Sequence, residues 1–177
     1  MMQLIRNYSE RLQPVKTEGE FSLFEYRPTI ISPLLVPFEP LRLIRRLRFW
    51  KEILSGGYRV YYLAESDILV GHCVVAPGGR RLTVSTKHDI VVGPYFIVPE
   101  HRGKGYAKVL VRMTLQNCTY NYRNAFDWIH IENLASIKTT EACGFMLEGH
   151  KLNVEGWTRK LVLDDNGSYL IYKYTRG

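Results

Sequence analysis

The residues best suited to bind a ligand form the loop Arg102-Gly103-Lys104-Gly105-Tyr106-Ala107, which joins an apolar strand-like run to a helical one. Glycines let the backbone turn sharply and bring several amide N–H groups close to a ligand. The N-terminus of the following helix adds unpaired donors and about half a positive charge. Together with Arg102, Lys104 and Lys108 these groups suit a pyrophosphate, and an ordinary glycine-containing turn is the alternative. The loop has neither the spacing of a Walker loop nor the third small residue of a dinucleotide fingerprint.

A second segment lies downstream of this loop. The strand-like run 127–132 is followed by Asn133-Leu134-Ala135-Ser136, and a short helix then closes with Glu141-Ala142-Cys143-Gly144-Phe145. The first loop, preceded by Val98-Pro99-Glu100, matches Arg/Gln-x-x-Gly-x-Gly/Ala, and the second segment matches Asn-x-x-(Ala/Ser)…Glu-x-x-Gly-Phe. With these two motifs in this order, the chain resembles the GNAT superfamily of acyl-CoA-dependent N-acyltransferases over roughly residues 58–174.

The resemblance implies a binding site for acetyl-CoA and assigns residues to it. In the family, the first loop wraps the CoA pyrophosphate, and pantetheine pairs with the backbone of the strand before it. The corresponding strand residues here are Tyr95, Phe96 and Ile97, and Asn133 would lie beside pantetheine. The full set implied for acetyl-CoA is Tyr95, Phe96, Ile97, Arg102, Gly103, Lys104, Gly105, Tyr106, Ala107, Lys108, Asn133 and Ser136.

Acyl transfer to an amine needs a deprotonated nucleophile, stabilisation of the oxyanion and a proton for the departing thiolate. A backbone N–H in the strand 95–97 is placed to polarise the thioester carbonyl. The family's usual proton donor is a tyrosine seven residues after the motif asparagine, but this chain has Thr140 there. An alcohol is a weak general acid, so water, Ser136, Cys143 or no residue at all are alternatives to Thr140.

Glu132 is the carboxylate that we predict as general base. The alternatives are Asp89, His88 and Asp127. Glu132 could instead cap the helix that begins near Asn133. We predict a satisfied core position for His130, an exposed turn for His88 and a packing role for Cys143. No HExxH motif, cysteine pair or His/carboxylate cluster indicates a metal site, and we expect none.

The elements that must position these residues can be read from the hydrophobic pattern. A proline-rich connection over 28–40 precedes a helix over 41–54, where Leu43, Leu47, Trp50 and Leu54 share one face. We predict strands over 59–63 and 68–76 as a hairpin, over 81–85, and over 90–98 with a bulge at Gly93-Pro94. A helix over 102–118, a strand over 127–132 and a helix over 133–143 follow. Strands over 145–152, 159–163 and 169–174 complete the pattern, the last two joined as a closing hairpin by the turn 164–167.

This order predicts a mixed α/β (α+β) domain. The resemblance specifies a GNAT-like fold, in which a mostly antiparallel sheet with splayed central strands is flanked by helices. The chain of 177 residues has the length of one domain, so we expect a single domain over 1–177. Within it, 58–174 would form the acyl-CoA-binding core and 1–57 a variable region on the acceptor side.

Composition narrows the class of protein. A charged fraction of 23% and an aromatic content of 12% exclude a disordered or collagen-like chain. No run of about 18 apolar residues predicts a membrane span, the N-terminal segment has no secretory h-region, and three cysteines without paired spacing fit reduced thiols. We therefore expect a cytoplasmic protein. The surplus of 24 Lys and Arg over 17 Asp and Glu, a net charge of +7, favours an anionic partner.

The resulting expectation is an N-acetyltransferase that moves an acetyl group from acetyl-CoA to the primary amine of a small molecule. The arginines of the early helix would suit an anionic amino sugar or nucleotide sugar; they are Arg42, Arg45, Arg46 and Arg48. Those arginines could equally form a solvated face or meet an anionic membrane surface. A non-catalytic CoA-binding module and a protein or peptide N-acetyltransferase are competing hypotheses. We expect no nucleic-acid partner and no stable membrane association, and a homodimer stays open.

Overall fold

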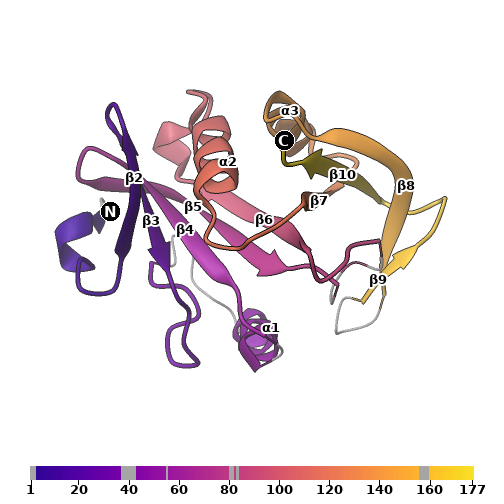
Figure 1. Ribbon diagram of the computed structural model, residues 1–177, viewed down its shortest axis with the longest axis horizontal. Helices are drawn as coiled ribbons and strands as arrows, with labels where there is room; N and C mark the ends of the chain where they lie inside the picture. The colour runs from indigo at the N-terminus through magenta and orange to yellow at the C-terminus, as the bar shows by residue number, and fades with distance from the viewer. Residues whose placement is uncertain (1–2, 37–42, 55, 80–81, 83, 156–159) are drawn as a thin grey trace. The chain divides into compact units, whose positions relative to one another are not determined.

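The computed structural model describes residues 3–36, 43–54, 56–79, 82, 84–155 and 160–177 (Figure 1). Its contacts divide the chain into two compact units. The first unit comprises residues 1–75 and 94–117, and the second comprises 76–93 and 118–177. The chain crosses between the units after Val75, Gly93 and Asn117, so the strand that contains Gly93 and Pro94 starts in one unit and ends in the other.

The first unit consists of a set of strands and two helices. Its elements are β1 (Gln3–Leu4), β2 (Gln13–Glu18), β3 (Phe21–Tyr26), α1 (Leu43–Leu54), β4 (Arg59–Glu65), most of β5 (Ile68–Pro77), the end of β6 (Asp89–Ile97) and α2 (Tyr106–Asn117). The ladders β2–β3, β3–β4 and β4–β5 are antiparallel. Helices α1 and α2 lie on opposite sides of these strands (Figure 1).

The core of the first unit explains why these segments fold as they do. Residues Val60 to Ala64 in the middle of β4 are fully buried, as expected of a strand covered on both faces. Helix α2 buries Leu110, Val111 and Leu115, which lie at the spacing of one helical face. Helix α1 differs from the prediction, because Phe49 packs against Tyr58 with ring centroids 5.4 Å apart while Leu47 and Leu54 are exposed.

The second unit surrounds the start of β6. Its other elements are β7 (Asn124–His130), α3 (Leu134–Ala142), β8 (Met146–Glu155), β9 (Lys160–Leu163) and β10 (Tyr169–Thr175). Strand β7 pairs in parallel with β6 from Asp89–Asn124 to Val91–Phe126, and β10 pairs antiparallel with β7. The core of this unit contains Leu82, Val91, Phe126, Leu152, Leu161 and Ile171.

Over the described residues the strands follow the order β2-β3-β4-β5-β6-β7-β10-β8-β9, with β1 added beside β5. One parallel ladder among antiparallel ones makes this a mixed sheet, so the predicted mixed α/β class is confirmed. Gly93 adopts a φ of +106°, a backbone conformation that side chains disfavour, directly before Pro94. This irregularity fits the bulge predicted for β6, whereas the splaying of β6 and β7 beyond their ladder stays a prediction.

The elements differ from the prediction in three places. Strands β1 to β3 were not predicted, although Gly19, with a φ of +59°, makes the turn between β2 and β3. The described residues of the segment 81–85 form turns instead of a strand. The closing hairpin is also wrong, because β8 lies between β9 and β10, with Leu152 opposite both Leu163 and Tyr169. The turn at Asp164 to Gly167 exists, but it passes across the backbone of Leu152 to reach the far side of β8.

Candidate functional site

The loop between β6 and α2 has the conformation that an anion-binding turn needs. Gly103 and Gly105 adopt φ values of +75° and +84°, in the left-handed region that favours glycine. A Cβ added at either residue would meet no atom within 4 Å, so both glycines are required by the backbone and not by packing. The loop from Arg102 to Gly105 is exposed. Its backbone is therefore accessible to a ligand.

Helix α2 begins at Tyr106, directly after the second of these glycines. The carbonyl of Gly105 accepts hydrogen bonds from the amides of Lys108 at 3.0 Å and Val109 at 3.2 Å. The amides of the first helical turn have no partner within the helix, and the helix dipole favours a negative charge beside them. The backbone from Gly103 to Ala107 therefore has the conformation expected of the loop, and anion binding there stays a prediction.

The three basic side chains around this loop differ in what they can do. Arg102 donates from Nε to the carbonyl of Ile97 at 2.9 Å and lays its guanidinium over the ring of Phe96, 5.1 Å from the centroid. Arg102 therefore fastens the loop to the end of β6. Lys104 and Lys108 are exposed, and Lys104 is the nearer to the glycines in sequence.

Replacing Lys104 with Ala should weaken acetyl-CoA binding about threefold at low salt, because an exposed charge near a phosphate contributes less than ~1 kcal/mol. The effect should fade at high salt, where exposed charges are screened. Calorimetric titration at two salt concentrations measures it, with Lys16→Ala on β2 as an equally exposed control in the same unit. Equal losses in the two variants would contradict a local role for Lys104.

Tyr106 contributes its backbone to the loop, whereas its side chain is anchored elsewhere. Its hydroxyl donates to the carboxylate of Glu65 at the end of β4, and its ring packs edge-on against Phe21 at 5.1 Å. His101 reaches the other oxygen of Glu65 at 3.3 Å. The hydrogen bond to Glu65, followed by burial, raises the pKa of Tyr106 to about 12. The side chain holds the start of α2 against β4 in the first unit.

The strand residues that we expect beside pantetheine form the last part of β6. Tyr95 and Phe96 are half-buried and Ile97 is buried. The ring of Phe96 stacks on His72 of β5, with centroids 6.0 Å apart. Beside it, a Cβ on Gly71 would come within 2.5 Å of the carbonyl oxygen of Phe96. Sequence reasoning missed Gly71 and His72, because only the pairing of β5 with β6 gives them a role.

The substitution Gly71→Ala on β5 should therefore displace the backbone of β6 at Phe96. The new methyl group meets a backbone oxygen that cannot move alone, and overpacking of this kind costs about 1–3 kcal/mol. We expect both a lower free energy of unfolding and weaker acetyl-CoA binding. Gly19→Ala is the control, since its φ of +59° makes alanine costly while no atom lies within 4 Å. It should lose stability yet bind acetyl-CoA normally, and an equal loss of binding would refute a specific role for Gly71.

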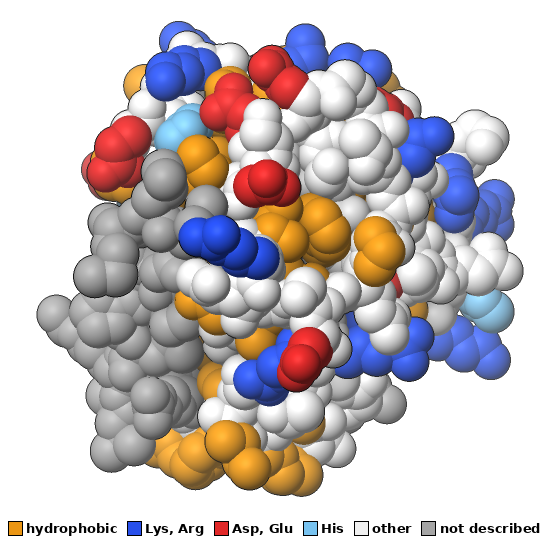
Figure 2. Space-filling model, turned by 90° about the vertical axis from the view of Figure 1, so that its left-hand side faces the viewer, with side chains coloured by type: hydrophobic (Ala, Val, Ile, Leu, Met, Phe, Trp, Pro, Cys, Tyr) orange, Lys and Arg blue, Asp and Glu red, His pale blue; other side chains and the backbone are white. Residues whose placement is uncertain are grey.

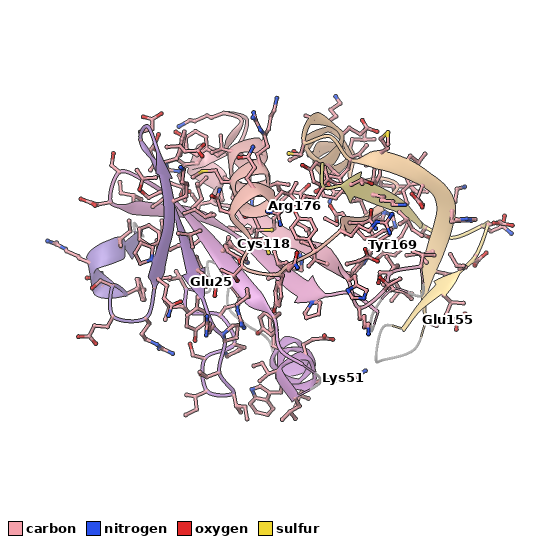
Figure 3. The ribbon with its side chains drawn as sticks, viewed as in Figure 1. Glu25, Lys51, Cys118, Glu155, Tyr169 and Arg176 are labelled. Atoms are coloured by element: carbon pink, nitrogen blue, oxygen red, sulfur yellow. The ribbon has the colours of Figure 1, made fainter. Side chains whose placement is uncertain are left out.

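In the second unit, the predicted residues at the start of α3 cap the helix. The side chain of Asn133 accepts a hydrogen bond from the amide of Ser136 at 3.2 Å, the arrangement of an N-cap. Glu132 is therefore not the cap. Its side chain is 85% exposed and lies 3.8 Å from Nδ1 of His130. His130 is not a core residue either, since it is 40% exposed and packs edge-on against Tyr169, which Figure 3 labels on β10.

The other proposed bases differ in their surroundings. His88 is exposed in a turn, as predicted. Asp89 is buried and accepts hydrogen bonds from the backbone and hydroxyl of Thr86 and from the backbone and side chain of Asn124. Burial raises the pKa of Asp89, but these hydrogen bonds outweigh it and hold the pKa below its ordinary value. Asp89 is thus a carboxylate that ties β6 to its neighbours.

Thr140 and Asp127 form a buried pair. The hydroxyl of Thr140 donates to Oδ2 of Asp127 at 3.0 Å, and both residues are almost fully buried. Burial raises the pKa of Asp127 to about 7, although the hydrogen bonds from Thr140 and the Trp128 backbone act in the opposite direction. The hydroxyl that stands at the family's tyrosine position is therefore directed at a carboxyl group.

Another buried carboxylate, Glu25, was missed by the sequence reasoning. It lies on β3, labelled in Figure 3, and accepts a hydrogen bond from the hydroxyl of Tyr61 at 2.9 Å. Arg59 and Arg27 lie 3.2 Å and 3.3 Å from the same carboxylate. Because these groups compensate its charge, we assign Glu25 to the stability of the first unit.

The remaining expectations concern the acceptor side, thiols and metals. Arg42 and the side chains of Arg45, Arg46 and Arg48 lie outside the described residues, as do residues 156–159.

All three cysteines are buried thiols, including Cys143 beside the end of α3. Within the described part of the chain, no three His, Cys, Asp or Glu residues gather as a metal site would require. No described helix is long and apolar enough to cross a membrane.

Comparison with known proteins identifies the family of this chain. The model of the acetyltransferase (GNAT) family matches residues 25–145, more than half of the chain. A spermidine N(1)-acetyltransferase of Vibrio cholerae is 36% identical over 56 residues, which are 30% of this chain and 32% of that protein. The match thus spans about a third of the length of that relative.

Solved structures agree with the fold. The RimL ribosomal L7/L12 alpha-N-protein acetyltransferase superposes with a TM-score of 0.62 at 16% identity, over 98% of this chain and all of its own. The protein yncA of Salmonella typhimurium, solved with its cofactor acetyl-CoA, gives a TM-score of 0.52 at 17% identity over 74% of this chain and 71% of its own. At sequence identities this low, the structural similarity shows a shared fold.

Proposed function

Because the chain belongs to the acetyltransferase (GNAT) family, we propose that it moves an acetyl group from acetyl-CoA to the primary amine of a small molecule, by direct attack in a ternary complex. The family assignment makes the chain an acyltransferase with acetyl-CoA as acyl donor, as the resemblance implied. The observation that carries the proposal is the exposed loop with two left-handed glycines at the start of α2. We also propose one catalytic domain over 1–177, with 58–174 as the acyl-CoA core and 1–57 on the acceptor side.

The donor site of this proposal uses the residues described above. The amides of Gly103 to Ala107 would hold the pyrophosphate, Lys104 and Lys108 would add charge, and Arg102 would brace the loop against Phe96. The backbone from Tyr95 to Ile97 would pair with pantetheine and polarise the thioester carbonyl. Asn133 and Ser136 would act through the helix start that they cap.

Two classes of amine acceptor fit this proposal. The arginines of the early helix favour an anionic amino sugar or nucleotide sugar, whereas the local similarity to a spermidine N(1)-acetyltransferase favours a polyamine. On the face shown in Figure 2, the described acidic side chains lie mainly toward the top and centre, whereas Lys and Arg side chains predominate along the right-hand edge. Glu132 is the base that we propose to test first, because its exposed carboxylate can exchange protons with water.

The test is thiol release from acetyl-CoA across a panel of amines. The panel contains spermidine, glucosamine 6-phosphate, a nucleotide-linked amino sugar and a peptide with a free N-terminus. Amine-dependent release with an acetylated product supports the proposal, and the preferred amine identifies the acceptor class. Tight binding of acetyl-CoA without release for any amine would favour a non-catalytic CoA-binding module, and preference for the peptide would favour a protein N-acetyltransferase.

A further inference from the structure

Glu65, the last residue of β4, contacts the residues on either side of the glycine loop. Its Oε1 accepts the hydrogen bond from the hydroxyl of Tyr106, and its Oε2 lies 3.3 Å from Nε2 of His101. His101 immediately precedes the loop 102–105, and Tyr106 immediately follows it. All of these residues belong to the first unit. One side chain therefore connects the two flanks of the loop.

The backbone at Glu65 is fixed by its neighbours in the sheet. Glu65 stands opposite Phe21 of β3 on one side and Ile68 of β5 on the other. Ser66, which follows it, adopts a φ of +53° in the turn to β5, and its amide donates to the carbonyl of Glu20 at 2.8 Å. The carboxylate of Glu65 is thus presented to the loop from a backbone that three strands hold in place.

The two partners of this carboxylate suit a group that can only accept hydrogen bonds. The phenol of Tyr106 donates to one oxygen, and a ring nitrogen of His101 faces the other. The second ring nitrogen of His101, Nδ1, is buried and has no hydrogen-bond partner within the described part of the chain. The rings of His101 and Tyr106 also pack together, with centroids 5.4 Å apart. The polar contact of this imidazole is therefore the one with Glu65.

The glycines of the loop have no side chains to hold its conformation. Gly103 and Gly105 are exposed, and an added Cβ at either residue would meet no atom within 4 Å. Glycine also loses more conformational freedom on ordering than any other residue. Contacts at the flanks must therefore order this loop. Arg102 provides one such contact, to the end of β6, and Glu65 provides contacts at both flanks.

We propose that Glu65 is the positioning residue of the pyrophosphate loop. By contacting His101 and Tyr106 at once, its carboxylate keeps Gly103 and Gly105 ordered in the free protein, so that less conformational freedom is lost when the ligand binds. In this role Glu65 acts through the residues that flank the loop. The inference rests on the proposed function, because it takes the loop to be the site of the acetyl-CoA pyrophosphate.

The substitution Glu65→Ala distinguishes positioning from the effect of charge. A carboxylate repels a nearby phosphate, so loss of the charge alone would lower the Kd for acetyl-CoA. Release of both flanks should instead raise this Kd about tenfold, because the loop must then be ordered on binding. Calorimetric titration measures the change. A Kd that falls or stays the same in a folded Glu65→Ala protein would overturn the inference, whereas a natural protein that does not bind acetyl-CoA would refute the proposed function.

Glu148→Ala is the matched control for this substitution. Glu148 on β8 lies 3.5 Å from Nζ of Lys173, and its side chain is 32% exposed, against 27% for Glu65. Both variants therefore lose one half-buried carboxylate and its contact with a basic side chain. Glu148→Ala should bind acetyl-CoA as the natural sequence does. An equal rise of the Kd in the two variants would overturn the inference.

An acyl donor without the pyrophosphate separates positioning of the loop from a general loss of structure. S-acetylpantetheine contains the thioester and the pantetheine but no phosphate. With the best amine of the panel, Glu65→Ala should lower kcat/KM about tenfold for acetyl-CoA and leave it unchanged for S-acetylpantetheine. Equal losses with both donors would show that Glu65 supports the fold and not the loop.

Tyr106→Phe tests one flank while Glu65 is retained. Removal of the hydroxyl should raise the Kd for acetyl-CoA about threefold, the effect of one hydrogen bond. In the Glu65→Ala protein the same substitution should have no further effect, because the hydroxyl has already lost its acceptor. Additive losses in the double variant would overturn the inference. If Glu65→Ala does not fold, the comparison of the two donors is made with Tyr106→Phe, and equal losses there count against the inference in the same way.

Discussion

Gly105→Val should raise the Kd for acetyl-CoA by about 30-fold. At a φ of +84° a β-branched side chain is strained, so the backbone must leave the left-handed region and carry its amides with it. Loss of one charge-assisted hydrogen bond to a phosphate costs about 2 kcal/mol, which corresponds to that change in Kd. Calorimetric titration with acetyl-CoA measures the effect directly.

Gly149→Val is the matched control for this prediction. Gly149 lies on β8 with a φ of +85°, is exposed, and has no atom within 4 Å of an added Cβ. The two variants carry the same backbone strain, so their free energies of unfolding should fall by similar amounts. Only Gly105→Val should bind acetyl-CoA weakly. Normal binding by a folded Gly105→Val protein would show that the loop does not hold the pyrophosphate.

Asp127→Asn should make the protein more stable than the natural sequence above pH 7, by a margin that grows as the pH rises toward 7. The pKa of Asp127 is raised from 3.8 to about 7, so between these values the folded state holds a proton that the unfolded state has lost. The free energy of unfolding of the natural protein therefore falls as pH rises through this window, by on the order of 4 kcal/mol when the shift is complete. Asparagine keeps an acceptor for Thr140 and carries no charge.

Thermal unfolding from pH 4 to pH 8 tests this prediction. The difference in Tm between Asp127→Asn and the natural sequence should be small near pH 4, grow through pH 5–7 and level off above it. Asp89→Asn should behave oppositely, because hydrogen bonds hold the pKa of Asp89 low and its carboxylate stabilises the fold. A Tm difference for Asp127→Asn that does not vary with pH would contradict the raised pKa.

The parts of this protein that the sequence predicts are those fixed by local chemistry. The loop at Gly103 and Gly105 was predictable because two close glycines before a helix have few conformational alternatives. Asn133 was identified by its motif. In the structure its side chain accepts the hydrogen bond from the amide of Ser136 that caps α3, and an asparagine is well suited to this role. The hairpin of β4 and β5 follows from apolar runs on either side of a short polar turn.

The parts that could not be predicted depend on contacts between distant residues. The exchange of β8 and β10 leaves the Asp164 turn intact, so the turn residues alone cannot indicate it. Arg102, which we predict at the phosphate, also contacts the carbonyl of Ile97 and the ring of Phe96, and the sequence does not indicate these contacts. Asp127 stood among several candidate bases. Its burial beside Gly93 and Thr140 arises only when β6, β7 and α3 come together.

The central claim is that the loop from Arg102 to Lys108 holds the acyl donor. Amide hydrogen exchange measures it most directly, because the amides of Gly103 to Ala107 lie at the exposed start of α2 and should exchange rapidly in the free protein. Saturating acetyl-CoA should slow these amides at least about tenfold, as hydrogen-bonded donors require, while the amide of the exposed Gly149 on β8 remains unchanged. Unaltered exchange at residues 103–107 in a protein saturated with acetyl-CoA would contradict the account.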